Sequence, residues 1–140
     1  MSLYIDPSAL LPAFVEEARS DTVDRLLRTS NEALCVSEFA AAEFASALSR
    51  LVRTHVLDQD LALQRLADFD AWRAAEAVLI DVESADIRSA SIIVRRFDLM
   101  LRTPDALHVA IARRLGAALV TFDHRLATAA RAMGVAVQIL

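Results

Sequence analysis

Short apolar runs alternate with longer helical segments along this sequence, and the alternation constrains its fold more than any other feature. The apolar runs are predicted strands and cover residues 3–5, 33–36, 78–80, 117–121 and 135–139. Strands joined by helices need crossover connections, so the sheet should be largely parallel, with helices on both faces. The sequence therefore predicts an α/β protein, a three-layer α/β/α sandwich around a mostly parallel five-stranded sheet.

The segments between these runs carry the apolar spacing of helices. We predict helices over residues 9–17, 21–28, 58–75, 84–99, 103–115 and 123–133, together with a long helix that Ser37 caps. Thr103 is the predicted N-cap and Pro104 the first residue of its helix, which Gly116 ends. A chain of 140 residues with 56% hydrophobic content, 2 glycines and 3 prolines predicts a single domain over residues 1–140.

Charge and composition narrow the classes of function. The net charge of −4 argues against broad attraction to nucleic acid, so such binding needs a local basic patch. All 15 basic residues are arginine, which excludes mechanisms that require a catalytic lysine. The single cysteine, Cys35, excludes an internal disulfide and a cysteine-based zinc site. Because we find neither a signal segment nor an apolar stretch of about 18 residues, we expect a soluble cytoplasmic protein without membrane association.

Four acidic residues are predicted to meet at one edge of the sheet. Asp6 and Asp123 follow the first and fourth strands, and ligands bind at strand carboxyl ends in open α/β sheets. Asp105 lies in the first turn of a helix that runs antiparallel to the fourth strand, so this turn should approach the same edge. Glu43 lies on the helix that leaves the second strand. The topology therefore predicts a cluster of four carboxylates.

Each acid also has a purely structural explanation. Asp6 and Asp123 suit the N-caps of the helices that follow, Asp105 complements a helix dipole, and Glu43 can lie on a solvated face. Together, however, neighbouring carboxylates repel, and at neutral pH one must be protonated unless a cation is bound. Mg²⁺ or Mn²⁺ prefers such oxygen ligands and can activate water for hydrolysis. The cluster therefore predicts a metal-dependent hydrolase.

Four segments carry a resemblance to a known family over essentially the whole length of the chain. They are Tyr4-Ile-Asp-Pro-Ser8, Val36-Ser-Glu-Phe-Ala-Ala-Ala-Glu-Phe44, Pro104-Asp-Ala-Leu-His-Val-Ala110 and Leu119-Val-Thr-Phe-Asp-His-Arg-Leu126. In this order and at this spacing, the sequence resembles the PIN-domain ribonucleases, specifically the VapC toxins of type II toxin–antitoxin systems. The resemblance implies a PIN-like fold and a Mg²⁺- or Mn²⁺-dependent endoribonuclease acting on single-stranded RNA.

The resemblance also implies site residues and partners. The family's four acids map onto Asp6, Glu43, Asp105 and Asp123, and its supporting polar residues map onto Ser8 and Thr121. Family members are usually homodimers, and a cognate antitoxin occludes their active site and represses the shared operon. We therefore expect an RNA substrate, a homodimer and an antitoxin partner.

For the mechanism, we hypothesise that Asp6, Asp105 and Asp123 bind the metal ion while Glu43 binds or orients water. RNA hydrolysis would then leave 5′-phosphate and 3′-hydroxyl ends, as it does in the family. Two arginines that flank the acids in sequence, Arg102 and Arg125, are candidates to hold RNA phosphates.

The histidines are expected to have structural roles. We expect His108 to be a hydrogen-bonded histidine at a helix packing surface, and His124 to give local polar support at a helix start.

Two other classes of function stay open. The first alternative is another metal-dependent phosphoesterase or nuclease, acting on DNA. The second is a non-catalytic α/β binding module whose acids only cap helices.

Overall fold

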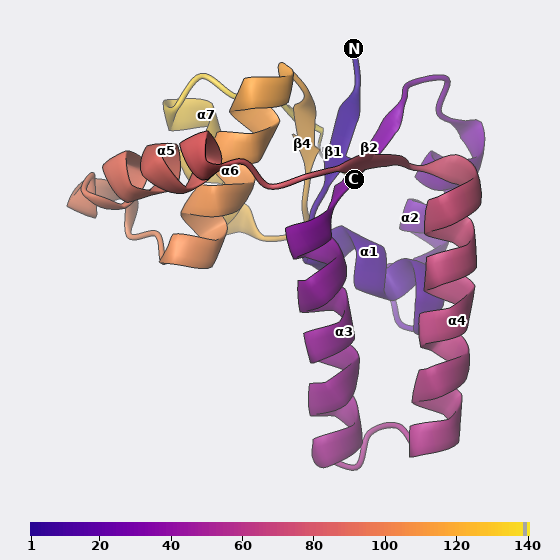
Figure 1. Cartoon of the computed structure of the whole chain (residues 1–140). Helices are drawn as coiled ribbons and strands as arrows, with labels where there is room; N and C mark the ends of the chain where they lie inside the picture. The colour runs from indigo at the N-terminus through magenta and orange to yellow at the C-terminus, as the bar shows by residue number, and fades with distance from the viewer. Residues whose placement is uncertain (139) are drawn as a thin grey trace.

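The computed structural model describes residues 1–138 and 140 of the chain, and a five-stranded parallel sheet forms its centre (Figure 1). The strands are β1 (Leu3–Ile5), β2 (Leu34–Ser37), β3 (Val78–Ile80), β4 (Ala118–Val120) and β5 (Val137–Gln138). Their order is β3-β2-β1-β4-β5, and each neighbouring pair is parallel. The predicted three-layer α/β/α sandwich is therefore confirmed.

Seven α-helices and one short 3-10 helix connect the strands in the described residues. They are α1 (Pro7–Phe14), α2 (Ser20–Thr29), α3 (Glu38–Arg53), α4 (Gln59–Glu76), α5 (Ser84–Val94), η1 (Phe97–Leu99), α6 (Thr103–Leu115) and α7 (His124–Ala132). None of the helices in this part of the chain combines the length and the apolar character that crossing a membrane requires.

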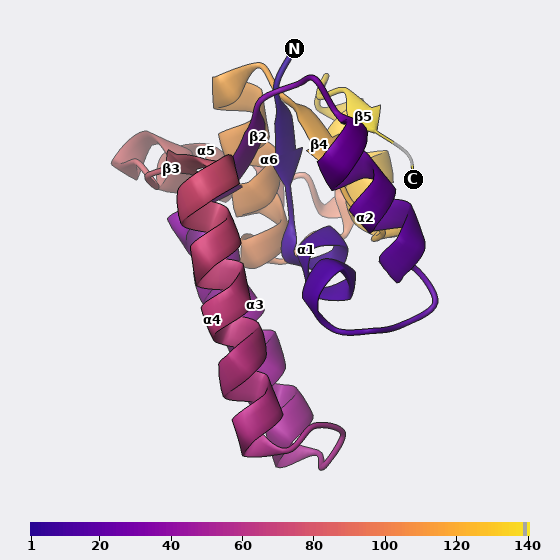
Figure 2. The same cartoon turned by 90° about the vertical axis from the view of Figure 1, so that its right-hand side faces the viewer.

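The alternation of side chains along the strands divides the core into two layers. Tyr4 and Leu119 face one side of the sheet, where α5, α6 and α7 cover them. Leu3, Ile5 and Val120 face the other side, where they pack with α1, α2, α3 and α4. Figures 1 and 2 show α3 and α4 as an antiparallel hairpin that extends beyond the sheet.

Capping residues set the starts of the helices that reach the site. Asp6 caps α1 through the Ala9 amide, Ser37 caps α3 through the Ala40 amide, and Asp123 caps α7. The predicted caps at Ser37 and Asp123 are confirmed. Helix α1 runs over 7–14 rather than the predicted 9–17, because the cap at Asp6 starts it earlier.

Two further predicted helix boundaries are wrong. The N-cap of α6 is Arg102 rather than Thr103, because Arg102 is extended and its amide donates to Asp105 Oδ2 (3.2 Å). The predicted helix over 84–99 is two elements, since Arg96 leaves the helical region at ψ 82° and Met100 adopts a left-handed conformation at φ 55°. The bounds of the strands agree with the predicted ones within two residues, except that the predicted end of the last strand, Ile139, lies outside the described residues.

Candidate active site

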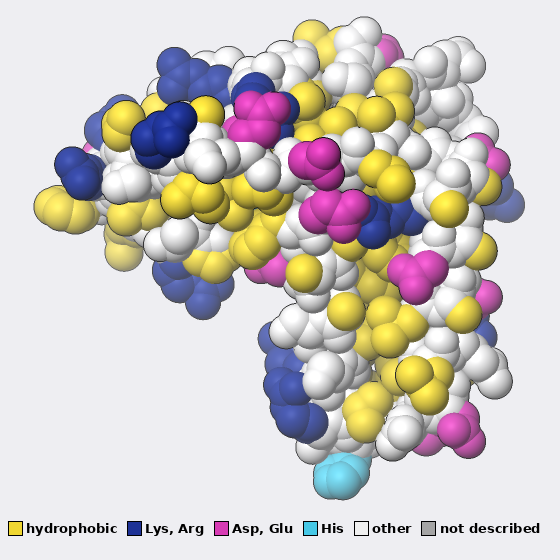
Figure 3. Space-filling model, in the orientation of Figure 1, with side chains coloured by type: hydrophobic (Ala, Val, Ile, Leu, Met, Phe, Trp, Pro, Cys, Tyr) yellow, Lys and Arg dark blue, Asp and Glu magenta, His cyan; other side chains and the backbone are white. Residues whose placement is uncertain are grey.

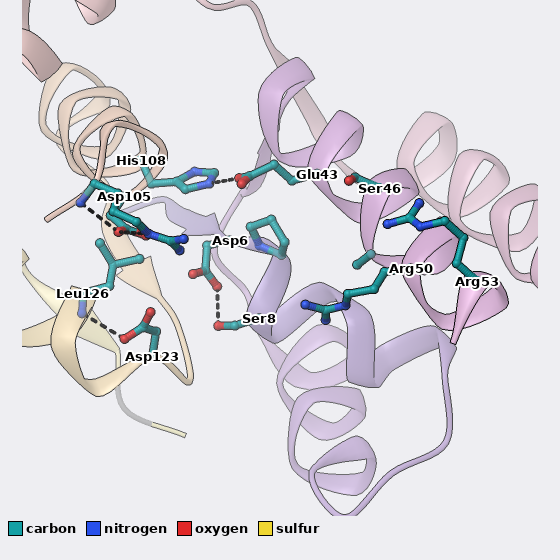
Figure 4. A pocket seen from close by; sticks show the side chains of 13 residues that line it. Asp6, Ser8, Glu43, Ser46, Arg50, Arg53, Asp105, His108, Asp123 and Leu126 are labelled. Atoms are coloured by element: carbon teal, nitrogen blue, oxygen red, sulfur yellow. Dashed lines mark hydrogen bonds and ion pairs between the residues drawn. The ribbon is translucent and has the colours of Figure 1, made fainter. Parts of the chain in front are cut away.

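A cavity of about 400 Å³ lies at the carboxyl edge of the sheet, and Asp6, Glu43, Asp105 and Asp123 all line it (Figure 4). Asp6 directly follows β1, and Asp123 follows β4 after two residues. These strands are neighbours, and the strand order reverses direction between them, which is where α/β sheets form ligand crevices. The fold therefore brings together the four acids predicted from the sequence.

Asp6 is the most buried of the four acids, with 3% of its surface exposed. Its Oδ1 accepts a hydrogen bond from Ser8 Oγ (2.7 Å), and its Oδ2 accepts one from Thr121 Oγ1 (2.8 Å). Burial raises the pKa of Asp6 above its ordinary value, although the bonds from Ser8 and Thr121 act in the opposite direction. A cation in the cavity would stabilise the ionised form of this side chain.

Ser8 and Thr121 link the ends of β1 and β4, as their predicted supporting role requires. Besides binding Asp6, Ser8 Oγ accepts from the Phe122 amide (2.9 Å), and Thr121 Oγ1 accepts from the Asp123 amide (3.0 Å). The two hydroxyls also lie 3.1 Å apart. This small network fixes the position of Asp6 relative to the backbone that carries Asp123.

Asp105 and Asp123 are held at helix starts. Asp123 Oδ1 accepts from the backbone amides of Arg125 (2.9 Å) and Leu126 (3.1 Å). Asp105 Oδ2 accepts from the Arg102 amide and lies 3.7 Å from Arg102 Nε. Each aspartate thus uses one carboxylate oxygen to start a helix, so the structural and functional explanations of these acids are compatible.

Glu43 reaches the cavity from α3, and its Oε1 contacts His108 Nε2. The other ring nitrogen, His108 Nδ1, lies 2.7 Å from the hydroxyl of Tyr4, and only 3% of His108 is exposed. The prediction of a hydrogen-bonded histidine at a helix packing surface is confirmed. His124 does not line this cavity.

Arginines line the same cavity as the acids. Arg102 does so, as predicted, whereas Arg125 lies on α7 outside the lining and contributes its backbone amide to Asp123. Arg50 and Arg53 of α3 also line the cavity and were not predicted. Glu43 and Arg50 are seven residues apart, two helical turns, so helical periodicity would have placed Arg50 near Glu43.

Basic side chains follow the edge of α3 that borders the hollow between this helix and the α5–α6 layer (Figure 3). Figure 4 shows Arg50 extending from α3 toward the side of the pocket that holds Ser8. Acidic groups therefore surround the inner cavity, and arginines of two elements, α3 and the start of α6, stand at its border. The arginines suit phosphate oxygens directly, whereas the carboxylates would repel a phosphate ester unless a cation lies between them.

The donor set fits a hard divalent cation. All four acids supply carboxylate oxygens, which Mg²⁺ and Mn²⁺ prefer. In the part of the chain that the structure describes, no three Asp, Glu, His or Cys side chains form a ready-made metal cage. Mg²⁺ commonly takes one or two carboxylates and keeps several waters, so a complete protein cage is not required. Fold and site together define an α/β protein with an acid-lined pocket suited to such an ion.

Comparison with known proteins places the chain in a family. The model of the PIN domain matches residues 3–132. Ribonuclease VapC46 of Mycobacterium tuberculosis is 34% identical over 97% of this chain and 95% of that protein. Ribonuclease VapC3 of Pyrobaculum aerophilum is 28% identical over 91% of this chain and 93% of that protein. The chain belongs to the PIN-domain family and resembles its VapC ribonucleases over nearly its full length.

Solved structures with low sequence identity share the fold. VapC20 of Mycobacterium tuberculosis, described as a toxin that cleaves the Sarcin-Ricin loop, has a TM-score of 0.73 at 20% identity, covering 91% of this chain and 95% of that one. VapBC2 of Rickettsia felis, solved with a DNA fragment from its promoter, has a TM-score of 0.73 at 14% identity, covering 100% and 99%. These likenesses confirm the predicted PIN-like fold.

Proposed function

We propose that this chain is a Mg²⁺- or Mn²⁺-dependent endoribonuclease and the toxin of a type II toxin–antitoxin pair. The observation that carries the proposal is the cavity in which Asp6, Glu43, Asp105 and Asp123, from four separate segments, meet beside arginines. Its family membership and the ribonuclease names of its relatives support the same reaction.

Asp6, Asp105 and Asp123 would hold the metal ion. A bound divalent ion would supply a Lewis acid for the phosphodiester oxyanion and lower the pKa of a water molecule. The protein fixes the direction of each carboxylate beforehand: Ser8 and Thr121 hold Asp6, and helix starts hold the other two. Because no three acids among the described residues form a ready-made cage, some of the three aspartates would act on the ion through bound water.

Glu43 would orient the attacking water. Because His108 Nε2 contacts Glu43 Oε1, the second oxygen, Oε2, is the atom that can accept a hydrogen bond from water. Attack at phosphorus with departure of the 3′-oxygen would leave a 5′-phosphate and a 3′-hydroxyl, as inferred from the resemblance.

Arg50, Arg53 and Arg102 would bind phosphate groups that flank the scissile bond. Their guanidinium groups carry fixed charge and paired donors, which suit phosphate oxygens. They also provide the local basic patch that a chain of net charge −4 needs for binding RNA. Arg125 lies near Asp123 and could bind a phosphate group farther from the scissile bond, since it is outside the cavity lining.

The VapBC structures that share this fold favour a cognate antitoxin as the partner of this chain. As in the family, the antitoxin would cover the acid-lined cavity, the toxin would be a cytoplasmic homodimer, and the two genes would be controlled together.

Expression in a bacterial host tests the proposed function. We expect the wild-type chain to arrest growth, and co-expression of the neighbouring upstream reading frame to restore it. Asp6→Asn should not arrest growth, because Asn keeps the size and capping ability of Asp6 but removes the charge. Equal toxicity of the wild-type chain and Asp6→Asn, at matched protein levels, would overturn the proposal.

A further inference from the structure

A buried chain of polar groups runs behind the cavity. The Tyr4 hydroxyl lies 2.8 Å from Ser37 Oγ and 2.7 Å from His108 Nδ1, and His108 Nε2 contacts Glu43 Oε1. Tyr4 and Ser37 are fully buried and His108 is 3% exposed. Figure 4 shows the last link, with the His108 ring directed at the Glu43 carboxylate. Buried polar chains of this kind fix geometry because each unmade bond is costly.

This hydrogen-bond network joins the three parts of the fold that carry Asp6, Glu43 and Asp105. Tyr4 lies on β1 two residues before Asp6, and His108 lies on α6 one turn after Asp105. Ser37 caps α3, the helix that carries Glu43, by accepting from the Ala40 amide (2.9 Å). The relative placement of three acids therefore depends on one set of hydrogen bonds.

With His108 neutral, one assignment of donors satisfies every link. Ser37 Oγ accepts from the Ala40 amide and donates its proton to the Tyr4 oxygen. The Tyr4 hydroxyl donates to His108 Nδ1, which leaves the Nε2 proton for Glu43. In this assignment, the bond from Tyr4 selects the tautomer of His108 that carries its proton on Nε2.

We propose that Ser37, Tyr4 and His108 form a positioning unit that holds Glu43 through its Oε1 and directs Oε2 into the cavity. This inference rests on the proposed function, since it assigns the unit a role in that reaction. His108 acts through Glu43 and is a positioning residue. Its ring also packs against Phe39, with ring centroids 5.2 Å apart, which keeps the imidazole from turning away.

Two substitutions at His108 separate positioning from packing. In His108→Gln, the amide nitrogen is as many bonds from Cα as Nε2, so the donor to Glu43 is retained. In His108→Asn, the amide oxygen can take the place of Nδ1 and accept from the Tyr4 hydroxyl, but the side chain is too short to offer Glu43 a donor. Both variants remove the ring, and Gln fills one methylene more of the buried space than Asn, so a packing effect would appear as a difference in melting temperature. Positioning predicts a difference in the site that does not follow the melting temperatures.

The first readout is the affinity for Mn²⁺ alone, measured by electron paramagnetic resonance without RNA. Glu43 would contact the ion only through the water that it orients, so we expect His108→Asn, which leaves Glu43 without its donor, to bind Mn²⁺ up to about tenfold more weakly than wild type. His108→Gln should retain most of the affinity. In RNA cleavage the same order should appear in kcat. Equal losses in the two variants, or losses that follow their melting temperatures, would overturn the proposal.

The second readout is the ¹⁵N NMR spectrum of the His108 ring in the metal-free protein. We expect the Nε2-protonated tautomer, a shifted Nε2 signal in Glu43→Gln, and a shifted Nδ1 signal in Tyr4→Phe. An Nδ1-protonated ring, or an Nε2 signal that ignores Glu43→Gln, would overturn the inference. Since neither readout on the protein alone requires RNA, failure of the wild-type chain to cleave RNA would overturn the proposed function separately.

Discussion

Thr121→Val is the substitution that most sharply tests how the site is built. Valine has nearly the shape of threonine but lacks the hydroxyl that joins two of the acids. Thr121 Oγ1 donates to Asp6 Oδ2 (2.8 Å) and accepts from the Asp123 amide (3.0 Å). Thr121 is 6% exposed, so water cannot readily replace either bond. The substitution therefore removes two hydrogen bonds with little change in volume.

The expected loss of stability follows from these two bonds. A hydrogen bond to a charged group contributes about 1.5–3 kcal/mol and a neutral one about 0.5–1.5 kcal/mol, so Thr121→Val should cost about 2–4 kcal/mol. In a domain of this size, 1 kcal/mol shifts the melting temperature by about 3 °C, so we expect a decrease of about 6–12 °C. Losing the bond to Asp6 should also weaken Mn²⁺ binding, since the carboxylate is no longer fixed.

Thermal unfolding followed by circular dichroism, with a parallel Mn²⁺ titration, measures both effects. Thr121→Ser is the matched control, because it keeps the hydroxyl and loses only a methyl group, and it should stay within about 1 kcal/mol of wild type. If Thr121→Val melts within a degree or two of wild type and binds Mn²⁺ equally well, the link between β1 and β4 does not organise the site.

Two further predictions concern the arginines. Burial would raise the pKa of Asp86, but two hydrogen bonds from Arg114 (2.7 and 2.9 Å) hold this pKa below its ordinary value. The pair therefore stabilises the fold fully above the ordinary pKa of aspartate. This stabilisation is lost as the pH falls through the lowered pKa of Asp86. Arg114→Leu should cost about 3–5 kcal/mol at pH 7. In urea unfolding, the difference from wild type should begin to shrink as the pH falls toward about 4, because Asp86 of the variant, without Arg114, takes up a proton at a higher pH than Asp86 of the wild type. A pH-independent difference would contradict this. Arg50→Ala should weaken RNA binding and reduce the slope of log affinity against log salt concentration by about one. Arg88→Ala, on α5 outside the cavity lining, should change neither quantity. Fluorescence anisotropy over a salt series measures both, and equal effects of the two substitutions would show that Arg50 does not contact RNA.

Much of the architecture could be predicted because it depends on local patterns. Apolar runs and helix caps locate the elements, and parallel strands bring their carboxyl ends to one edge. Asp6 and Asp123 could therefore be placed together from their positions after two strands. Asp105 followed from the direction of its helix, since the start of α6 faces the same edge.

The contacts inside the site could not be predicted, because they depend on side-chain packing between distant segments. His108 is 65 residues from Glu43 and 104 from Tyr4, and no local pattern indicates that their polar atoms meet. Arg50 is different, because it lies two helical turns after Glu43 on α3 and helical periodicity could have indicated it. The break after α5 depends on the backbone turn at Arg96.

The aspartates of the cavity would serve a metal-dependent nuclease as well as the starts of helices. The most direct test is RNA cleavage by purified protein in Mg²⁺ or Mn²⁺, comparing Asp123→Asn with Asp58→Asn. Both residues cap helices, Asp58 through the Leu61 amide (2.7 Å), but only Asp123 lines the cavity.

Asn replaces Asp well as a cap, so both variants should fold. We predict that Asp123→Asn loses at least about a hundredfold in cleavage rate, equivalent to about 2.7 kcal/mol of transition-state stabilisation. Asp58→Asn should cleave RNA as fast as wild type, and EDTA should abolish cleavage by both of these proteins. If Asp123→Asn cleaves RNA as fast as wild type, and EDTA does not stop it, these aspartates are not metal-dependent nuclease residues.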